Sequence, residues 1–310
     1  MSYRLVNYFA SDNAPRAGVL VNDIVTDLKS GIDALKTKTG SDGFDGTSTI
    51  SAIQAWDKAE PLIAEVAAAA SKVAKTFARS EIKFAAPLLY PNNIFCAAAN
   101  YRDHFREMSN ADVDKSKIKP YFFNKVARQT VIGSGEQIRK PKVCQKLDWE
   151  AEIVAVIGKR GRNIKAANAL DHVIGYTIIN DLSARDFIQR PDWPLIRSDW
   201  LWQKSFDTSA PMGPWITPKS EVPDPQNLKI DTWVNERHEQ NTHSREMVFT
   251  VAEQIEALSE HFTLLPGDVI ATGTGSGVGH PKGRYLNPGD MVRIEIEKLG
   301  ELRNPVIAGE

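Results

Sequence analysis

The sequence has little cysteine and almost no excess of charge of either sign. Its two cysteines, Cys96 and Cys144, show no CxxC spacing, so neither a disulfide framework nor a cysteine zinc site is expected. Lysine and arginine number 38 against 39 aspartates and glutamates, which gives a net charge of -1. This balance offers no electrostatic reason to expect nucleic acid or an anionic membrane as partner, and it favours a small-molecule ligand.

Long hydrophobic runs and several familiar motifs are also missing. No stretch approaches the roughly 20 apolar residues of a membrane span, and the first residues lack a secretory signal pattern, so we expect a cytoplasmic protein. The nucleotide-binding patterns GxGxxG and GxxxxGK[ST], the GxSxG of serine hydrolases and the HExxH of zinc proteases are absent. These absences argue against a nucleotide site, a serine hydrolase and a zinc protease.

The length of 310 residues suggests about two domains. The stretch 84–93 contains two prolines and little periodicity, so we place the boundary there. A small N-terminal α+β domain is predicted for residues 1–85 and the main domain for 86–310. The first is expected to contain a hairpin turning at Asn22–Asp23.

The rest of the N-terminal part reads as loop and helix. Residues 40–48 are rich in turn formers and are expected to form an exposed loop. Residues 49–79 have a helical composition and predict two helices interrupted near Pro61, because proline lacks the N–H that a helix interior requires.

The main part is predicted to be β-rich, without the strand-helix alternation of a doubly wound sheet. From Ile94 onward the pattern becomes strand-rich, beginning with the stretch 94–101. Further strands are expected at 121–123, around 138, and at 150–157, 173–179, 228–234, 268–272 and 291–299. Helices are expected at 164–170 and 251–262. The polar segment 102–119 has few apolar anchors, and it is either a lid that is ordered part of the time or a plain surface loop.

The stretch 147–158 carries the feature around which the site is predicted. Its alternation is typical of a β-strand, in which residues two apart share a face. One face is apolar, and the other begins with Asp148, Glu150 and Glu152. Carboxylates two apart lie about 7 Å from each other and repel by about 2 kcal/mol per pair at an effective dielectric near 20. A cation would reverse that sign, and the alternative is a strand end solvated by water.

A further acidic residue, Asp181, follows the apolar strand predicted at 173–179. It either caps a helix that begins at Leu182 or supplies another carboxylate to the same site. With Glu150 and Glu152 it would form an all-oxygen set without histidine or cysteine. Such hard ligands favour Mg²⁺, Mn²⁺ or Ca²⁺ over zinc.

His104 and Glu107 are three residues apart, so on a helical turn they share one face. The carboxylate can then orient the imidazole, as a general base acting on water requires. The alternative is a solvated surface pair. Lys204, and less clearly Lys125, either extends along the apolar surface or stabilises negative charge in a site.

The turn at 271–280 has glycine at every second position from Gly273 to Gly279. These glycines allow the backbone to approach a ligand closely. Thr274 adds a possible hydroxyl donor to the turn.

Taken together, these segments resemble the fumarylacetoacetate hydrolase family. The matching strings, in the family's order from about residue 92 to 306, are NYRDHFREM, LDWEAEIVAVIGKRGRNI, IGYTIINDLSARD, KSFDTSAPMGPWI, LLPGDVIATGTGSGVG and YLNPGDMVRIEIEKLGELRNPV. The resemblance implies a mixed β-roll, usually in a homodimer. It also implies that a divalent metal, Mg²⁺ in the first place, is held by Glu150, Glu152 and Asp181.

The resemblance further implies roles for the other site residues. His104 and Glu107 would activate water on a closing lid, and Lys204 would lie near the reacting oxygen. The residues expected to contact the substrate are Arg106, Lys125, Arg185, Gln189 and Thr274.

The implied activity is metal-dependent hydrolysis of a carbon-carbon bond in an acylpyruvate or related 1,3-dicarbonyl, such as a fumarylacetoacetate-like or fumarylpyruvate-like compound. In this hypothesis the activated water attacks the distal carbonyl and an enolate leaves. Other members decarboxylate, hydrate or isomerise 2-oxo acids. An oxaloacetate-type decarboxylase, or a hydratase or isomerase of aromatic catabolism, is therefore the alternative. Outside the enzymes, the alternative is a non-catalytic metal-dependent binder of 2-oxo acids.

The chain departs from the family pattern at several positions. Where many members have a glycine before NY, this chain has Ala98-Ala99. Where they have a proline after the lysine, it has Val126 after Lys125, and in place of TGTP it has Thr272 to Gly275. The additional acidic ligand and distant glutamate of the founding members are not found, which groups the chain with the shorter acylpyruvase-like members. Segment 187–203 is longer than is usual in the family. Its tryptophans, with Arg190 and Arg197, either shape substrate choice or cover the core.

Overall fold

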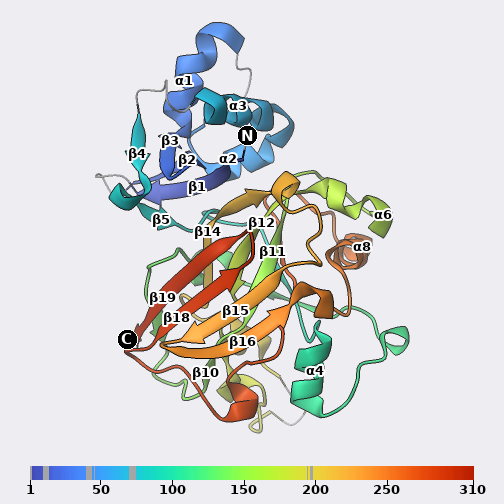
Figure 1. Ribbon diagram of the computed structural model, residues 1–310. Helices are drawn as coiled ribbons and strands as arrows, with labels where there is room; N and C mark the ends of the chain where they lie inside the picture. The colour runs from blue at the N-terminus through green and yellow to red at the C-terminus, as the bar shows by residue number, and fades with distance from the viewer. Residues whose placement is uncertain are drawn as a thin grey trace.

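The computed structural model describes residues 2–9, 14–39, 44, 46–69, 75–193, 195 and 198–310. Within these residues the strands form a 12-stranded sheet, a 5-stranded sheet and a 2-stranded ladder, with helices at the periphery (Figure 1). The strand-rich α+β class expected from the sequence is therefore confirmed.

The 12-stranded sheet joins the N-terminal and central parts of the chain. Its strand order is β4-β3-β2-β1-β14-β12-β11-β17-β6-β7, with β5 beside β1 and β8 beside β14. Because β1 pairs with β14, the N-terminal strands continue the central sheet. The division into domains at residue 85 stays a prediction. The strands are β1 (Arg4–Phe9), β2 (Pro15–Val21), β3 (Ile24–Asp27), β4 (Thr76–Ala78), β5 (Lys83–Ala85), β6 (Ile94–Ala97), β7 (Phe122–Lys125), β8 (Val131–Ile132), β11 (Ala151–Ile157), β12 (Val173–Asn180), β14 (Ala210–Pro218) and β17 (Val269–Ala271).

The 5-stranded sheet lies in front of the central strands in the view of Figure 1, with β16 at one edge. Its order is β16-β15-β18-β19-β9, and a separate ladder pairs β10 with β13. These strands are β9 (Ile138–Lys140), β10 (Leu147–Asp148), β13 (Ser183–Ala184), β15 (Lys229–Val234), β16 (Arg237–His243), β18 (Met291–Ile296) and β19 (Gly300–Ala308).

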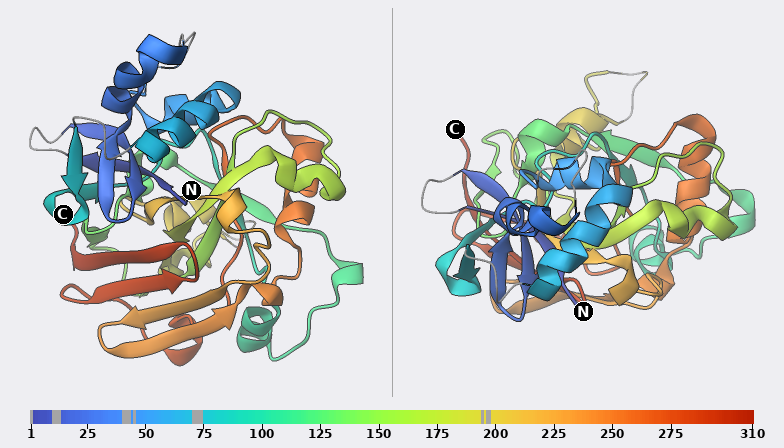
Figure 2. Two further views of the ribbon diagram at one scale, coloured as in Figure 1. Left: turned by 45° about the horizontal axis from the view of Figure 1, so that its top comes forward. Right: turned by 90° about the horizontal axis from the view of Figure 1, so that it is seen from above.

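The longer helices of the N-terminal part, α1 and α3, lie together over β1 to β3 (Figure 2). Leucines, isoleucines and valines of α1 and α3 form one buried cluster with β1 and β2. No helix among the described residues is long and apolar enough to cross a membrane. The α-helices are α1 (Leu28–Thr39), α2 (Thr49–Gln54), α3 (Trp56–Ala69), α4 (Arg102–Ser109), α5 (Ala127–Thr130), α6 (Ala166–Ala169), α7 (Trp200–Lys204) and α8 (Val251–His261).

The hairpin predicted at Asn22–Asp23 is confirmed. The two residues have φ values of 46° and 63°, as a two-residue turn that matches the strand twist requires. The loop expected at 40–48 falls partly outside the described residues, which include only 44 and 46–48 of it.

The helix prediction for 49–79 was wrong in two respects. The break lies at Ala55, whose N–H bonds to the carbonyls of Ser51 and Ala52 as the end of α2, and Pro61 lies inside α3. Residues 76–78 form strand β4, because they pair with β3 at the edge of the sheet. Tertiary pairing outweighs local helical composition there.

Strand β11 is buried on both faces. When both faces of a strand are apolar, the sequence no longer alternates between apolar and polar residues, so alternation alone does not predict this burial. Its odd-numbered residues pack in one cluster with residues of β15 and β18, and Val154 and Val156 pack in a second cluster with β1 and α3. The strand therefore joins the two cores and holds its N-terminal end in a fixed place.

Candidate metal centre and active site

Strands β11 and β12 bring three carboxylates together. Glu150 precedes β11, Glu152 is its second residue, and Asp181 directly follows β12, whose last residue pairs with Ala151. One oxygen of each carboxylate lies within 4.8 Å of the others, and all three residues are buried. The structure thus brings together the three side chains that the sequence predicted as a metal site.

Buried cations orient these carboxylates. The Lys204 ammonium donates to Glu150 Oε2 at 2.9 Å and to Asp181 Oδ2 at 2.7 Å. Lys125 donates to Asp181 Oδ1 at 2.7 Å, and Arg185 Nη2 donates to Glu150 Oε1 at 2.6 Å. Lys125 therefore pairs with Asp181 and does not line the cavity, whereas Arg185 and Lys204 both pair with Glu150 and line the cavity.

The surroundings shift the pKa values of Glu150 and Glu152 in opposite directions. Burial raises the pKa of Glu150, but the Lys204 and Arg185 cations outweigh it and lower the pKa to about 2. Burial together with the charges of Asp181 and Glu150 raises the pKa of Glu152 well above its usual range. A divalent cation among the three would remove this repulsion, and carboxylate oxygens are the ligands that hard divalent ions prefer. The residues present fit such an ion.

Helix α4 brings His104 and Glu107 to the same cavity. His104 is only 8% exposed and lines the cavity. Its Nδ1 lies 3.5 Å from Glu107 Oε2, an ion-pair distance that is too long for a good hydrogen bond. Both oxygens of Glu107 accept from the N–H of Gly277 at 3.0 Å. The glycine turn therefore fixes the carboxylate that faces the imidazole.

Asp103 anchors the start of α4, a role that sequence reasoning missed. Its Oδ1 accepts from the N–H of His104 at 2.8 Å, and its Oδ2 accepts from the hydroxyls of Thr242 at 2.5 Å and Ser276 at 2.9 Å. Thr242 lies in β16 and Ser276 in the glycine turn. The carboxylate thus ties the helix that carries His104 to two other parts of the fold.

Gln240, in β16, joins the carboxylate strand to the glycine turn. Its Oε1 accepts from the N–H of Ala151 at 3.1 Å and from the hydroxyl of Thr232 at 2.9 Å. Its Nε2 donates to Thr274 Oγ1 at 2.9 Å and to the carbonyl of Gly275 at 3.1 Å. Every polar atom of this buried carboxamide is used. The sequence carried no signal for it, because its partners come from distant segments.

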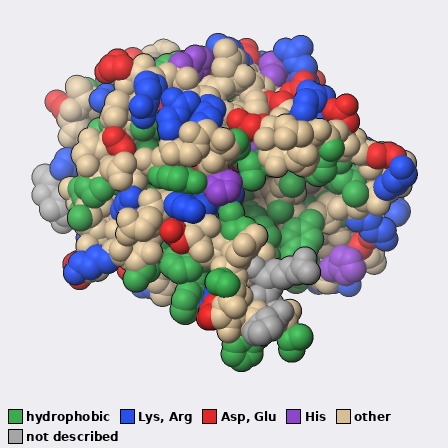
Figure 3. Space-filling view, turned by 90° about the horizontal axis from the view of Figure 1, so that it is seen from below, with side chains coloured by type: hydrophobic (Ala, Val, Ile, Leu, Met, Phe, Trp, Pro, Cys, Tyr) green, Lys and Arg blue, Asp and Glu red, His purple; other side chains and the backbone are tan. Residues whose placement is uncertain are grey.

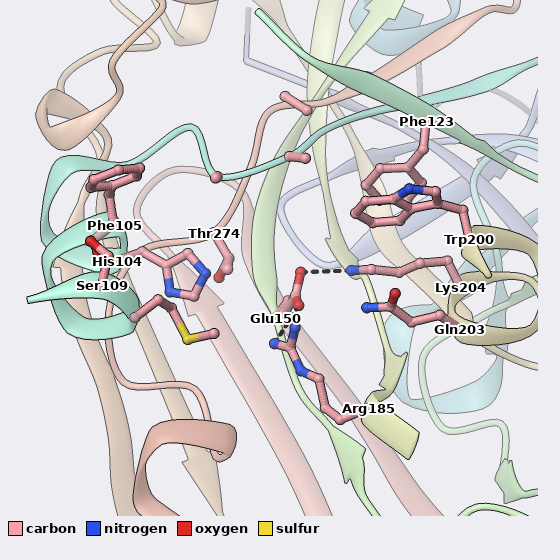
Figure 4. Close-up of a pocket in the computed structure, with 14 residues that line it drawn as sticks. His104, Phe105, Ser109, Phe123, Glu150, Arg185, Trp200, Gln203, Lys204 and Thr274 are labelled. Carbon is pink, nitrogen blue, oxygen red and sulfur yellow. Dashed lines mark hydrogen bonds and ion pairs between the residues drawn. The ribbon is translucent and has the colours of Figure 1, made fainter. Parts of the chain in front are cut away.

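The cavity measures about 260 Å³ and opens on the face seen from below, where hydrophobic side chains gather around a hollow (Figure 3). One wall comes from α4, the opposite wall from β7 and α7, and Glu150 and Arg185 lie between them (Figure 4). Phe123 and Trp200 stack with ring centroids 4.8 Å apart. The lining includes His104, Phe105, Met108, Phe123, Glu150, Arg185, Trp200, Gln203, Lys204 and Thr274.

Besides Lys125, two further residues expected to contact the substrate lie outside the cavity. Arg106 faces away from His104, since residues two apart on a helix point in different directions, and its side chain is paired with Asp112 on the surface. Gln189 is exposed and is not part of the cavity lining. Neither side chain belongs to the substrate site proposed below. Arg190 pairs with Asp199, and Arg197 lies outside the described residues.

The strand-rich fold and its buried carboxylate set are those of a class of proteins that could hold a divalent ion through oxygen ligands alone. The family described as "Fumarylacetoacetate (FAA) hydrolase C-terminal" matches residues 93–307. The chain belongs to the fumarylacetoacetate hydrolase family, and the resemblance drawn from the sequence is confirmed.

The names of known relatives refer to two kinds of reaction, tautomerisation and hydrolysis. "Oxaloacetate tautomerase fahd2, mitochondrial" from Xenopus laevis is 36% identical, with 99% of this chain and 91% of that protein covered. "Oxaloacetate tautomerase YisK" from Bacillus subtilis (strain 168) is 41% identical, with 74% of this chain and 75% of that protein covered. The maleylpyruvate hydrolase of Sphingobium sp. SYK-6, solved with manganese(II) and pyruvate, has a TM-score of 0.75 and 26% identity, with 99% and 100% of the two chains covered.

Proposed function

We propose that the chain catalyses the enol–keto tautomerisation of a 2-oxo acid, with oxaloacetate as substrate, at a divalent ion held by Glu150, Glu152 and Asp181. The names of the Xenopus and Bacillus relatives support this reaction. The observation that carries the proposal is that the buried carboxylate set adjoins a cavity also lined by the imidazole of His104. Carbon-carbon bond hydrolysis is the second candidate.

Tautomerisation requires that one proton leave the enol oxygen and that one proton be added to the neighbouring carbon. When bound, a divalent ion supplies Lewis-acid polarisation and stabilises negative charge on substrate oxygens. An imidazole can both accept and donate a proton near neutral pH. We therefore assign the proton transfer to His104, with Glu107 holding the ring in orientation.

Lys204 is assigned a different role. Burial opposes its charge, but the carboxylates of Asp181 and Glu150 outweigh burial and raise the pKa of the ammonium. Lys204 therefore stays protonated at neutral pH. Its charge stabilises the negative charge that develops on the substrate, and it does not act as a base.

The second candidate has its own support. A histidine beside a glutamate in the cavity is the arrangement that activates water for attack on a carbonyl, and one solved relative is named a maleylpyruvate hydrolase. Hydrolysis of an acylpyruvate would consume that water and release pyruvate together with a carboxylic acid. Decarboxylation of oxaloacetate would release pyruvate and carbon dioxide.

The products distinguish these reactions. The enzyme loaded with Mg²⁺ or Mn²⁺ is mixed with enol-oxaloacetate, the loss of enol absorbance is followed in the ultraviolet, and the products are identified by NMR. Keto-oxaloacetate as the first product supports the proposed function. Pyruvate as the first product, or acceleration with an acylpyruvate alone, would overturn it.

Three further expectations stay predictions. Mg²⁺ is proposed as the native ion, because all three proposed ligands are carboxylates. A homodimer is proposed from the family resemblance, and light scattering of the purified protein tests it. A cytoplasmic location is proposed from the sequence pattern, although the name of the Xenopus relative places that protein in mitochondria.

A further inference from the structure

In the part of the chain that the structure describes, the carboxamide of Gln203 faces the cavity without a hydrogen-bond partner. Gln203 is 3% exposed, and among the described residues no group donates a hydrogen bond to its carboxamide or accepts one from it. The cavity residues next to it are bonded, since Glu150 accepts from both Arg185 and Lys204. A ligand in the cavity can therefore form hydrogen bonds with this carboxamide that the protein itself does not supply.

The direction of this side chain is fixed by a short helix. Gln203 lies in α7, and its backbone N–H donates to the carbonyl of Asp199 at 2.9 Å. The Asp199 carboxylate accepts from the N–H of Trp202 at 2.9 Å and from Arg190 at 2.7 Å. The carboxamide points into the cavity toward Glu150, beside Lys204 (Figure 4). It is therefore held in place before a ligand binds.

Lys204, the residue after Gln203, has no N–H group left for a ligand. The three N–H groups of Lys204 are all used, by Glu150 Oε2, Asp181 Oδ2 and the carbonyl of Asp181. Phe123, over which the Lys204 ammonium lies at 5.0 Å from the ring centroid, offers an aromatic face. The Gln203 carboxamide adds two N–H donors without adding charge.

We propose that Gln203, beside Lys204, recognises the second carboxylate of the substrate, the one that is not adjacent to the 2-oxo group. The inference rests on the proposed function and assigns the residue that distinguishes oxaloacetate from 2-oxo acids without a second carboxylate. The 2-oxo group and the adjacent carboxylate of the substrate would lie toward Glu150, Glu152 and Asp181, which would hold the ion. The second carboxylate then accepts from the carboxamide of Gln203, and hydrogen bonds to an ionised acceptor are the stronger kind.

The test compares two substrates that share the 2-oxo acid head. Enol-oxaloacetate carries a second carboxylate, and enol-phenylpyruvate carries an apolar ring instead. In Gln203→Leu, kcat/KM for oxaloacetate is expected to fall about 10- to 100-fold, chiefly through KM, while the value for phenylpyruvate is retained. Equal losses for both substrates, or no loss for oxaloacetate, would overturn the inference.

Two controls separate recognition from folding. Gln129→Leu makes the same change at an exposed position of α5 outside the cavity. It is expected to leave kcat/KM unchanged for both substrates. Gln203→Glu keeps the size of the side chain but places a negative charge opposite the substrate carboxylate. It is expected to lower kcat/KM for oxaloacetate further than Gln203→Leu.

A binding measurement keeps this inference separate from the proposed function. Calorimetry on Mn²⁺-loaded protein compares 2-oxoglutarate with 2-oxobutyrate, which lacks the distal carboxylate. Wild-type protein is expected to prefer 2-oxoglutarate, and Gln203→Leu is expected to lose that preference. If the wild type tautomerises neither enol, the proposed function fails and this comparison still decides the role of Gln203. Absence of a preference in the wild type, including no binding of either acid, would overturn it.

Discussion

Gln240 Oε1 accepts a hydrogen bond from the backbone N–H of Ala151, with 3.1 Å between the two atoms. Ala151 stands between Glu150 and Glu152, and the same carboxamide donates to Thr274 in the cavity at 2.9 Å. A residue of β16 thus fixes the backbone from which two proposed metal ligands project. It also fixes the turn that forms part of the cavity.

Replacing Gln240 with leucine is expected to affect both stability and metal binding. The change leaves buried partners such as the Ala151 N–H unpaired, so the free energy of unfolding is expected to fall by about 2 kcal/mol or more. Loss of support for the ligands is expected to weaken Mn²⁺ binding about 10- to 100-fold. Urea denaturation and calorimetric titration measure the two effects. Unchanged Mn²⁺ affinity in a folded variant would contradict the proposed support.

Asp103 is expected to control the position of α4. In Asp103→Ala the hydroxyls of Thr242 and Ser276 lose their shared acceptor, so amide hydrogen exchange in peptides covering 102–109 is expected to increase. Because His104 is then held less well, kcat/KM is expected to fall about 10- to 100-fold. Asp112→Asn is the matched control, since that carboxylate pairs with Arg106 on the surface. Equal exchange in the two variants would remove this role from Asp103.

His104 is expected to affect the chemical step without affecting the ion. General acid–base help is typically worth about 10² to 10⁴ in rate, so His104→Ala is expected to lower kcat by that factor. Mn²⁺ affinity is expected to stay at the wild-type value, because the three carboxylates remain. Steady-state kinetics and calorimetry check the two statements. Turnover at the wild-type rate would refute the assignment of proton transfer to His104.

The segment after α4 is joined to α8 through a pH-dependent contact. Lys115 Nζ donates to both oxygens of Glu253, at 2.6 Å and 2.8 Å. Burial raises the pKa of Glu253, but the hydrogen bonds from Lys115 and Thr250 outweigh it and lower the pKa below its ordinary value. A carboxyl group whose pKa is lower in the folded state than in the unfolded state stabilises the fold at pH values above its unfolded-state pKa. This contribution is lost as the pH falls through the folded-state pKa.

The destabilisation caused by Glu253→Gln is therefore expected to be present at pH 7 and to disappear as pH falls below the ordinary glutamate range. Urea denaturation of wild type and variant across this interval measures the difference. The same destabilisation at every pH would show that the charge of Glu253 contributes nothing.

Local patterns in the sequence were sufficient for part of the fold and of the site. The alternation in 147–158 predicted a strand because side-chain period follows directly from strand geometry. Asp181 and Glu150 were recognised because each lies next to an apolar strand, where a carboxylate is unexpected. The turn at Asn22–Asp23 was recognised because these residue types tolerate positive φ.

Other features could not be predicted, because they depend on contacts between distant segments. Strand β14 contains three prolines, Pro211, Pro214 and Pro218, which argue against a strand, and yet it pairs between β1 and β12. The bond between Ser276 and Asp103 joins residues 173 positions apart. Likewise, the unpaired carboxamide of Gln203 becomes informative only once its neighbours are known to be bonded among themselves. Neither relationship leaves a local periodicity in the sequence.

The most direct test measures the loss of enol-oxaloacetate absorbance on one enzyme preparation as isolated with Mn²⁺, after chelation, and after Mn²⁺ is restored, with Glu152→Gln in parallel. We expect acceleration that chelation abolishes, that added Mn²⁺ restores, and that Glu152→Gln lacks at the same Mn²⁺ concentration. Acceleration that survives chelation, or that persists undiminished in Glu152→Gln, would contradict a tautomerase whose ion is held by Glu150, Glu152 and Asp181.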